Sequence, residues 1–338
     1  MKPENGWPHL VPSGAAPGAA GVFHQAMIGR DSAECIESVL AFVEDGLRQG
    51  EAVSVGLSAG LGRRLGRLLG TQRLVAYFDM TELGRNPGRI IAAMLDFART
   101  HAVPAPAAPG QAAPAQAAPA GPLLRYVSEP FWAGRSDAER AEATRHEALV
   151  EPALTGAPAT VLCVYNADRL DAESIACAEH LHPVVITDGE PRASARYVGS
   201  GVVPAQCDRP LAPPPADATA LGYRDDLRAV RDTVAACAAA AGLAPGRTTD
   251  LMLAVSEVAA NTLQHTQGPG TLQVWAAGPE LICQITDSGH ITDPLAGRRR
   301  PAADAFQHGG LWVVNQVCDL VELRSGPDGT TVRMHIRR

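Results

Sequence analysis

Short apolar runs alternate with amphipathic stretches between residue 21 and about residue 200. Runs rich in β-branched and aromatic residues predict strands at 53–57, 74–78 and 159–165. The amphipathic stretches, in which apolar residues recur every three or four positions, predict helices at 31–48, 59–69, 86–101, 136–154 and 171–181. Apolar strands that alternate with helices are typical of a mostly parallel sheet covered on both faces, so this half is predicted to be α/β.

The last third of the chain has a different pattern. It predicts, in order, helices at 222–242 and 246–265, strands at about 271–276 and 280–287, a helix at 309–318, and strands at 320–325 and 330–337. In the final strand Val332, Met334 and Ile336 alternate with polar residues, which indicates an antiparallel strand buried on one face. Two long helices on one face of such a sheet predict an α+β sandwich.

Three segments rich in proline, glycine or alanine divide the chain. Residues 1–20 are predicted to form a flexible tail, and the uncharged residues 104–122 a flexible insertion. Residues 203–217 contain a run of three prolines and are predicted to be a linker. The sequence therefore predicts two domains, at 21–202 and 218–338.

Composition argues against several classes of protein. The net charge is −7 and the densest basic cluster is Arg298-Arg299-Arg300, so no direct binding of nucleic acid is expected. No apolar stretch reaches the roughly 20 residues that span a bilayer, and a signal peptide is not expected. The seven cysteines are scattered without a Cys-x-x-Cys pair, which favours reduced thiols in a cytoplasmic protein and argues against a zinc site.

Four short motifs in the last quarter of the chain carry the candidate chemistry. The first lies on the predicted helix 246–265, where Glu257 and Asn261 are about one turn apart and so share a face. An amide oxygen can bind Mg²⁺ without adding negative charge beside phosphates, and a carboxylate can accept a proton from an attacking group. The same pair is also compatible with an ordinary solvated helix face.

The other three motifs lie at strand ends and turns. Asp287 ends a predicted strand and could accept a hydrogen bond from an amine such as that of adenine, while Gly289 allows close approach of the backbone. Gly309 and Gly310 precede a helix whose N-terminus could bind phosphates. Thr330 begins the last strand. Each motif alone is compatible with a turn, but their order and spacing together predict a nucleotide site.

The four motifs, in this order, resemble the ATP-binding domain of the GHKL superfamily, which includes histidine kinases and gyrase-type ATPases. Within it, DLMLAVSEVAANTLQHT and GLWVVNQVCDLVELRSGPDGTTVRMHI are similar to the anti-sigma-factor serine kinases. The resemblance implies a Bergerat-type α+β sandwich that binds ATP and Mg²⁺. The resemblance also implies a role for each motif. At the phosphate end, Asn261 ligates Mg²⁺, Glu257 is the base, and Gly309 and Gly310 lie at the phosphates. At the adenine end, Asp287 binds the adenine amine above Gly289 and Thr330 reaches the adenine region, while residues 290–308 form a lid.

Residues 21–200 resemble the MEDS domain, a sensory domain named after the methylotroph regulator DcmR, in segments such as YFDMTELGRNPGRIIAAMLDFA and VLCVYNADRLD. The segment 53–63 is similar to a RecA-like phosphate loop but lacks its Gly-Lys-Ser/Thr ending, so a RecA-like core with a degenerate phosphate loop is predicted. A pocket for a small-molecule or protein signal could draw on the polar and aromatic members of these segments, although capping and salt bridges would explain each equally well. They are His24, Glu129, Trp132, Arg135, His146 and Glu147.

Together the two halves resemble the two-domain anti-sigma regulators of actinobacteria. The resemblance implies a cytoplasmic serine/threonine kinase controlled by its N-terminal sensory domain. Such a kinase sequesters a sigma factor in one state and, in another, phosphorylates an anti-anti-sigma antagonist of the STAS type. Kinases of this kind commonly form homodimers.

Two other functions are compatible with the sequence. The segment 145–149 resembles the phosphoacceptor box of a sensor histidine kinase, with His146 as the acceptor, but the helical hairpin that such a box needs just before the ATPase domain is not predicted. Alternatively, ATP could hold a binding-competent conformation without any phosphotransfer. The Asp-x-Gly motif often continues with a second glycine, and the presence of His290 instead favours this binding switch.

Overall fold

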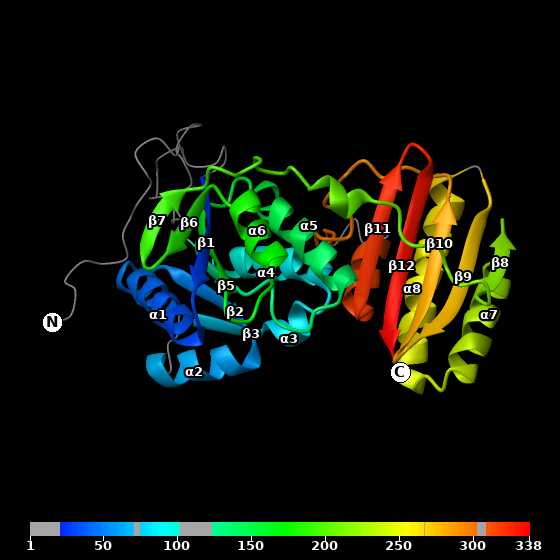
Figure 1. Cartoon of the computed structure of the whole chain (residues 1–338). Coiled ribbons are helices and arrows are strands. Elements are labelled where there is room, and N and C mark those ends of the chain that lie inside the picture. The colour runs from blue at the N-terminus through cyan, green and yellow to red at the C-terminus, as the bar shows by residue number, and fades with distance from the viewer. Residues whose placement is uncertain (1–20, 71–74, 102–123, 267, 303–308) are drawn as a thin grey trace, which may run out of the picture. The chain divides into compact units, whose positions relative to one another are not determined.

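The computed structural model describes residues 21–70, 75–101, 124–266, 268–302 and 309–338. The predicted tail 1–20 and insertion 104–122 lie outside these ranges. The chain divides into two compact units, and Figure 1 labels most of their helices and strands. The first unit takes most of the chain up to Val202, and the second takes Val203–Arg338 together with Arg85–Ala92 and Asp137–His146.

A seven-stranded sheet forms the centre of the first unit (Figure 1). Its strands lie in the order β3-β2-β4-β5-β1-β6-β7, and every neighbouring pair is parallel except β6 with β7. The bounds are β1 Val22–Gly29, β2 Ala52–Leu57, β3 Val75–Asp79, β4 Leu124–Ser128, β5 Ala159–Asn166, β6 Val184–Thr187 and β7 Glu190–Ala193. The predicted α/β fold with a mostly parallel sheet is confirmed.

Helices cover both faces of this sheet. Their bounds are α1 Ser32–Arg48, α2 Ala59–Leu69, α3 Met80–Leu83, α4 Ile90–His101, α5 Asp137–Ala153 and α6 Ala172–Leu181. On one face Phe42 of α1 and Leu65 of α2 share a buried apolar core with Val53 of β2. On the other face the hydroxyl of Tyr126 in β4 donates to the carbonyl oxygen of Met94 in α4, at 2.9 Å.

The predicted helix 86–101 is shorter than expected. The α-helix α4 begins at Ile90, and the preceding residues Pro87–Arg89 form a separate 3-10 helix, η1. Asn86 caps η1 by accepting a hydrogen bond from the N–H of Gly88 at 3.1 Å. Proline lacks the N–H that a helix interior needs, so the first turn ends as a tighter, separate element.

The second unit is built on a five-stranded antiparallel sheet of strand order β11-β12-β10-β9-β8. Its strands are β8 Thr219–Tyr223, β9 Gly270–Ala277, β10 Glu280–Asp287, β11 Leu320–Gly326 and β12 Gly329–Arg337. Its helices are α7 Leu227–Ala240, α8 Pro245–His265 and α9 Gly310–Val317, and the preceding segment contains the 3-10 helix η2 Ala205–Asp208. Helices on an antiparallel sheet confirm the predicted α+β architecture.

The predicted helix 222–242 is corrected at its start. Gly222 and Tyr223 belong to the edge strand β8, and α7 begins only at Leu227. Asp226 fixes this boundary, because its side chain accepts hydrogen bonds from the N–H groups of the second and third helical residues, Arg228 and Ala229, at 2.9 and 3.0 Å.

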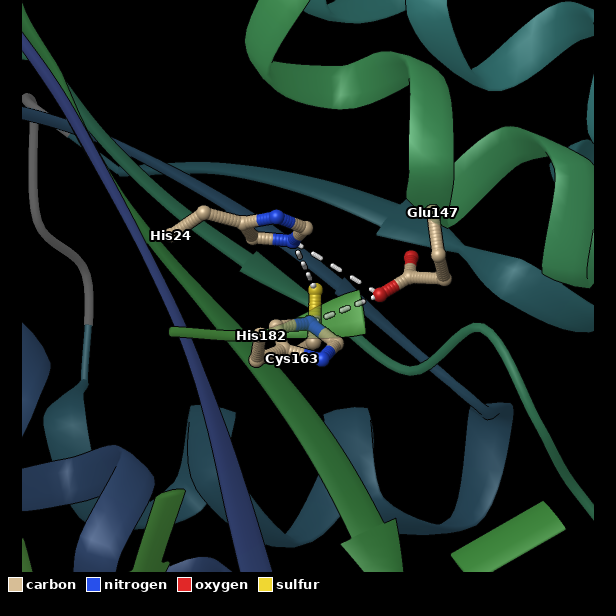
Figure 2. A group of neighbouring side chains, drawn as sticks. All are labelled: His24, Glu147, Cys163 and His182. Atoms are coloured by element: carbon tan, nitrogen blue, oxygen red, sulfur yellow. Dashed lines mark hydrogen bonds and ion pairs between the residues drawn. The ribbon is translucent and has the colours of Figure 1, made fainter. Parts of the chain in front are cut away.

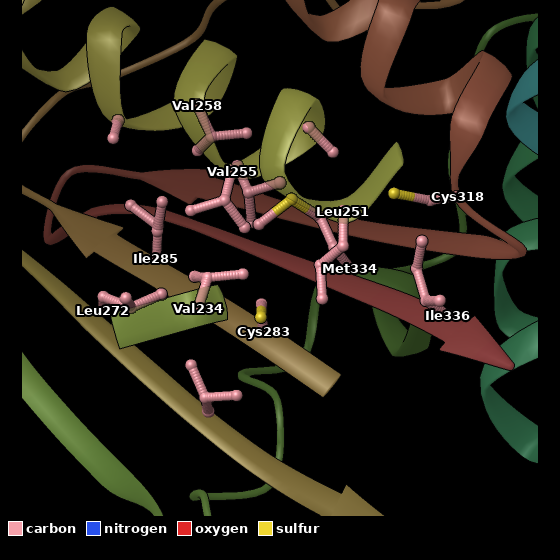
Figure 3. Packing of buried hydrophobic residues seen from close by; sticks show 14 of the residues in the cluster. Val234, Leu251, Val255, Val258, Leu272, Cys283, Ile285, Cys318, Met334 and Ile336 are labelled. Carbon is pink, nitrogen blue, oxygen red and sulfur yellow. The ribbon is translucent and has the colours of Figure 1, made fainter. Parts of the chain in front are cut away.

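The core of the second unit lies between its helices and its sheet. Figure 3 shows Val234 of α7 and Val255 of α8 packed with Cys283 of β10 and Met334 of β12, all fully buried. The apolar face of α8 is therefore fixed against the sheet, and its neighbouring polar residues are held at the edge of the sandwich. Within the described residues no helix has both the length and the apolar character that crossing a membrane requires.

Candidate nucleotide site

A cleft of about 610 Å³ lies in the second unit, among α8, the ends of β10 and β12, and the start of α9. Its lining includes Asn261, Asp287, Gly289, Gly309 and Thr330, five of the residues that the sequence motifs predict for a nucleotide site. The volume is within the usual range for small-molecule sites. Residues from four separate motifs are thus brought together around one cavity.

Glu257 and Gly310 do not line this cleft, but they adjoin its lining residues Val258 and Gly309. A Cβ atom on Gly310 would be 2.9 Å from Oε2 of Glu257 and 3.4 Å from Nδ2 of Asn261. The first residue of α9 therefore touches the polar face of α8 so closely that any side chain at position 310 would displace the Glu257 carboxylate. This contact fixes the distance between the two helices at the point where the motif residues meet.

Asp287, the last residue of β10, has both carboxylate oxygens held in place. Its Oδ1 accepts a hydrogen bond from the backbone N–H of Gly289 at 2.8 Å, and its Oδ2 accepts one from the hydroxyl of Thr262 at 2.6 Å. The hydroxyl of Tyr223 donates to Thr262 at 3.1 Å. A carboxylate oxygen can accept more than one hydrogen bond, so the oriented group can still accept one from an amine in the cleft. The sequence motifs include neither Thr262 nor Tyr223.

Thr330 lies opposite Asp287 in the β10–β12 ladder. Its hydroxyl donates to the carbonyl oxygen of Gly289 at 2.8 Å and lies 2.7 Å from the hydroxyl of Ser325. Because the Ser325 oxygen accepts the N–H of Ile291 at 2.7 Å, the Ser325 hydroxyl can donate its own proton to Thr330. This chain of hydrogen bonds ties the loop after β10 to the hairpin of β11 and β12.

A helix N-terminus and two arginines also border the cleft. Gly309 caps the N-terminus of α9, and Leu311 and Trp312 in its first turn line the cleft. The N–H groups of a first helical turn have no acceptors within the helix and attract anions. The exposed Arg299 and Arg300 line the same cleft, and the guanidinium of Arg300 lies 5.6 Å from the ring centre of Trp312. These arginines belong to the basic cluster 298–300 of the sequence, and none of the four motifs includes them.

The described part of the predicted lid, residues 290–302, contains no helix or strand. His290, Asp293 and Leu295 from this segment line the cleft. Residues 303–308 lie outside the described residues. That the segment 290–308 closes over a nucleotide stays a prediction.

The residues of the cleft fit an adenine nucleotide with a divalent cation. A fixed carboxylate, Asp287, can receive an amine, and the helix N-terminus with its two arginines can receive phosphates. Asn261 offers a neutral oxygen of the kind that Mg²⁺ accepts beside phosphate groups. The fold and the cleft together define a nucleotide-binding domain.

Comparison with known families is in agreement with this assignment. Residues 223–336 match the family model of the histidine kinase-like ATPase domain. Residues 23–183 match that of the MEDS domain, the methanogen/methylotroph DcmR sensory domain. No curated protein matches the chain. The chain thus joins a MEDS domain to a histidine kinase-like ATPase domain, a combination that indicates an ATP-dependent regulatory protein.

Two of the residues predicted for a sensory pocket lie together in the first unit. Glu129 and Trp132 line a second cleft, of about 400 Å³, at the carboxyl ends of β2, β4 and β5, the edge at which open parallel sheets commonly bind ligands. Glu129 accepts the N–H of Ser58 at 2.6 Å, and burial raises the pKa of Glu129. Arg135 stacks on Trp132 with its guanidinium carbon 3.5 Å from the ring centre, and donates to the carbonyl oxygen of Gly84 at 2.7 Å.

The other predicted pocket residues do not line this cleft. His24 lies on β1, and His146 and Glu147 lie on α5; each is at most 2% exposed. Two arginine side chains that were not predicted, Arg64 and Arg169, also line this cleft. The six predicted residues are therefore divided between an open cleft and the interior of the protein.

Proposed function

We propose that this protein is a cytoplasmic, ATP-binding anti-sigma regulatory factor whose MEDS domain controls a serine/threonine kinase. In this proposal it sequesters a sigma factor and phosphorylates an anti-anti-sigma antagonist of the STAS type. The observation that carries the proposal is the position of Glu257, which touches the first residue of α9 one helical turn from Asn261, beside a cleft suited to a nucleotide. A carboxylate at the phosphate end of the cleft is where a base for an acceptor hydroxyl is needed.

Each residue of the cleft has a separate task in this proposal. ATP, when bound, supplies the phosphoryl group. Asp287 accepts a hydrogen bond from the adenine amine, and the N–H groups at Gly309 and Gly310 attract the phosphates. Asn261 would ligate Mg²⁺ through its amide oxygen. The Glu257 carboxylate accepts the proton of a serine or threonine hydroxyl presented by the antagonist.

The identity of the partners rests on the resemblance of α7, α8 and the region from α9 to β12 to anti-sigma-factor serine kinases. A small STAS-type antagonist with an exposed serine or threonine would present its hydroxyl at the Glu257 side of the cleft. Phosphorylation would prevent the antagonist from releasing the sigma factor, so one ATPase domain would control both partners.

The test is a γ-phosphate-labelled ATP assay with Mg²⁺, the full chain and a panel of candidate antagonists. Acid-stable label on an antagonist serine or threonine is expected. Glu257→Gln should lower the rate of labelling by about 10²- to 10⁴-fold, the usual contribution of general base catalysis, while nucleotide binding is retained. Asn261→Ala should abolish Mg²⁺-dependent nucleotide binding, and Asp328→Asn, an exposed turn residue, is the matched control.

A second candidate function is an ATP-dependent binding switch without phosphotransfer. It is favoured by His290, which lines the cleft at a position where related motifs often have a second glycine. For such a switch, Glu257→Ala leaves partner binding intact while Asn261→Ala abolishes it. The absence of any label together with Asn261-dependent ATP binding would leave the switch as the better account of this domain.

A sensor histidine kinase is the third function compatible with the sequence. His146 is 0% exposed, so phosphorylation at this residue would require α5 to move. Acid-labile label on the protein itself in the same assay would contradict the serine/threonine kinase and support this alternative.

A further inference from the structure

Four metal-ligating side chains converge inside the first unit, away from both clefts. His24 of β1, Glu147 of α5, Cys163 of β5 and His182, directly after α6, point toward one another in Figure 2. One ligand atom from each residue lies within 4.8 Å of the other three, and each residue is at most 2% exposed. Burial of four polar side chains is costly unless they satisfy one another or hold an ion.

The hydrogen bonds around His182 determine which of its nitrogens faces the cluster. Its Nδ1 lies 2.8 Å from the carbonyl oxygen of Ala178, which can only accept, so Nδ1 carries a proton. In the neutral ring Nε2 then has a lone pair, and Nε2 lies 2.9 Å from Oε2 of Glu147. A lone pair and a carboxylate oxygen repel one another at this distance unless a positive charge, a proton or a metal ion, is associated with them.

The same carboxylate oxygen also faces His24. Nε2 of His24 lies 3.6 Å from Oε2 of Glu147 and 3.3 Å from Sγ of Cys163. On the other side of the ring, Nδ1 lies 3.8 Å from Oε1 of Glu151. His182 therefore turns Nε2 inward while Nδ1 donates to an outer acceptor, which is the arrangement that orients histidine ligands of metal ions in proteins. Nε2 of His24 also points inward, and its Nδ1 faces Glu151 beyond hydrogen-bond distance.

We propose that His24, Glu147, Cys163 and His182 bind a divalent transition-metal ion of the Zn²⁺ class. Two imidazole nitrogens, a thiolate and a carboxylate form a tetrahedral donor set typical of Zn²⁺, whereas Mg²⁺ and Ca²⁺ prefer oxygen alone. With metal–ligand bonds of about 2.1 Å, neighbouring donors of a tetrahedral site are roughly 3.4 Å apart. Three of the six separations, at 2.9, 3.3 and 3.6 Å, bracket this value, and all six are within 4.8 Å.

A site with four protein ligands has no open position, so the ion has a structural role. It links two neighbouring strands, β1 and β5, to α5 and to the end of α6. The thiol proton of Cys163 is released when the metal binds, since the thiolate is the ligand. The metal thus connects the sheet of the MEDS domain with the helices on one of its faces.

The test begins with the full-length, untagged chain, expressed in minimal medium with Zn²⁺ or with Co²⁺ in its place. Metal is supplied during expression because the closed cluster must take up the ion as the chain folds. Elemental analysis should find a single Zn²⁺ or Co²⁺ ion per chain after gel filtration. The Co²⁺ form should show the intense visible bands of tetrahedral cobalt and a near-ultraviolet band from thiolate-to-cobalt charge transfer.

Variants locate the ion within the chain. Cys163→Ser should lose the charge-transfer band, and Glu147→Gln and His182→Gln should each lower metal affinity in chelator competition by at least about tenfold. Two substitutions in the second unit, Cys237→Ser and His335→Gln, serve as matched controls and should retain both the metal and the spectrum.

Two results would overturn the proposal. One is a wild-type chain that is folded by near-ultraviolet circular dichroism but retains neither ion, which would leave the cluster as a buried hydrogen-bonded network. The other is a bound ion whose content and spectrum survive all three substitutions. The wild-type measurement decides the matter by itself even where a variant does not fold.

Discussion

The two polar sites of this protein differ in how their side chains are satisfied. In the first unit, His24, Glu147 and His182 are sealed in the interior and face one another. In the second unit, Asp287 is oriented by Thr262 and Gly289 and still borders an open cleft. A cluster closed on itself contributes to stability or holds an ion. A group that is oriented by its neighbours but open to solvent is prepared for a ligand.

The largest expected effect comes from removing one carboxylate from each site. Glu147→Ala leaves His182 buried beside a cavity, and loss of one partner of a buried pair typically costs about 3–5 kcal/mol of unfolding free energy. Glu257→Ala, at a half-buried position next to the lining residue Val258, should change this free energy by no more than about 0.5 kcal/mol while it abolishes the proposed phosphotransfer. Urea denaturation of both variants measures the difference.

The proposed difference between the two carboxylates, one structural and one functional, would be contradicted if both substitutions lowered the unfolding free energy equally. Equal losses would mean that Glu257 also supports the fold, through its contact with Gly310, and its assignment as a base would need independent evidence. Equal, small losses would mean that the closed cluster contributes little to stability without its metal.

Two glycines in the hairpin between β11 and β12 test how far the open cleft depends on the backbone. Gly329 has a φ of 122°, and a Cβ atom there would lie 2.2 Å from the carbonyl oxygen of Asp287. Gly329→Ala should therefore cost about 2–3 kcal/mol of unfolding free energy, by backbone strain and steric overlap. A Cβ atom on Gly326, its partner in the ladder, would have no neighbouring atom within 4 Å, so Gly326→Ala is the control.

The control variant should stay within about 0.5 kcal/mol of the wild type. Thermal or urea denaturation, followed by nucleotide titration, would check both variants. An unchanged nucleotide affinity in a destabilised Gly329→Ala protein would show that the strain does not reach Asp287.

Five residues of the sequence motifs line the open cleft, and each motif can be recognised in the sequence because it is local. Glu257 and Asn261 are about one turn apart on one helix, and the order of the four motifs is readable along the chain. The supporting residues Thr262 and Ser325 were missed because a hydroxyl is informative only once its partner is known. The partner of Thr262 comes from the packing of α8 on β10, and the partner of Ser325 lies in the loop after β10. Neither contact is visible in a single sequence.

The closed cluster could not be predicted, because it depends on distant residues. His24 and Cys163 are 139 positions apart and meet only because β1 pairs with β5. The strand β4 was also missed, since it is buried throughout yet carries Arg125, which is paired in the interior with Asp45 and Glu51. A charged residue in a short apolar run weakens the strand pattern, and the tertiary ion pair that permits its burial is not readable from the sequence.

Nucleotide affinity offers a sharper test of the oriented carboxylate. Asp287→Asn keeps the shape of the side chain but removes the charge that would accept the adenine amine. A hydrogen bond to a charged group is worth about 1.5–3 kcal/mol, so affinity for ATP should fall roughly 10- to 100-fold in calorimetric titrations. Asp328→Asn, at an exposed position in the hairpin between β11 and β12, should leave the affinity unchanged. Equal affinities for both variants would place the adenine elsewhere.

The smallest expected effect on stability concerns a histidine whose two ring nitrogens are both hydrogen-bonded to carboxylates. His335 lies between Glu280, 3.0 Å from its Nδ1, and Glu322, 3.0 Å from its Nε2. Burial lowers the pKa of His335, but its hydrogen bonds to the two carboxylates outweigh burial and raise the pKa above its usual value of 6.5. Hydrogen bonding to His335 likewise holds the pKa of Glu280 below its usual 4.5, against the effect of burial. Each imidazole nitrogen has its own carboxylate here, whereas two imidazoles share one carboxylate in the closed cluster.

The pH dependence of stability follows from these directions. The contribution of His335 is fully present below about pH 6.5 and is lost as the pH rises through the raised pKa of the folded state. The contribution of Glu280 is fully present above about pH 4.5 and is lost as the pH falls through its lowered pKa. The difference in unfolding free energy between the wild type and His335→Gln should therefore be greatest between these values, at about 1 kcal/mol, and should shrink on either side. Urea denaturation across this range measures it. A difference that stayed constant from acid to alkaline pH would show that His335 is neutral in the fold and that its carboxylate neighbours do not act as a pair.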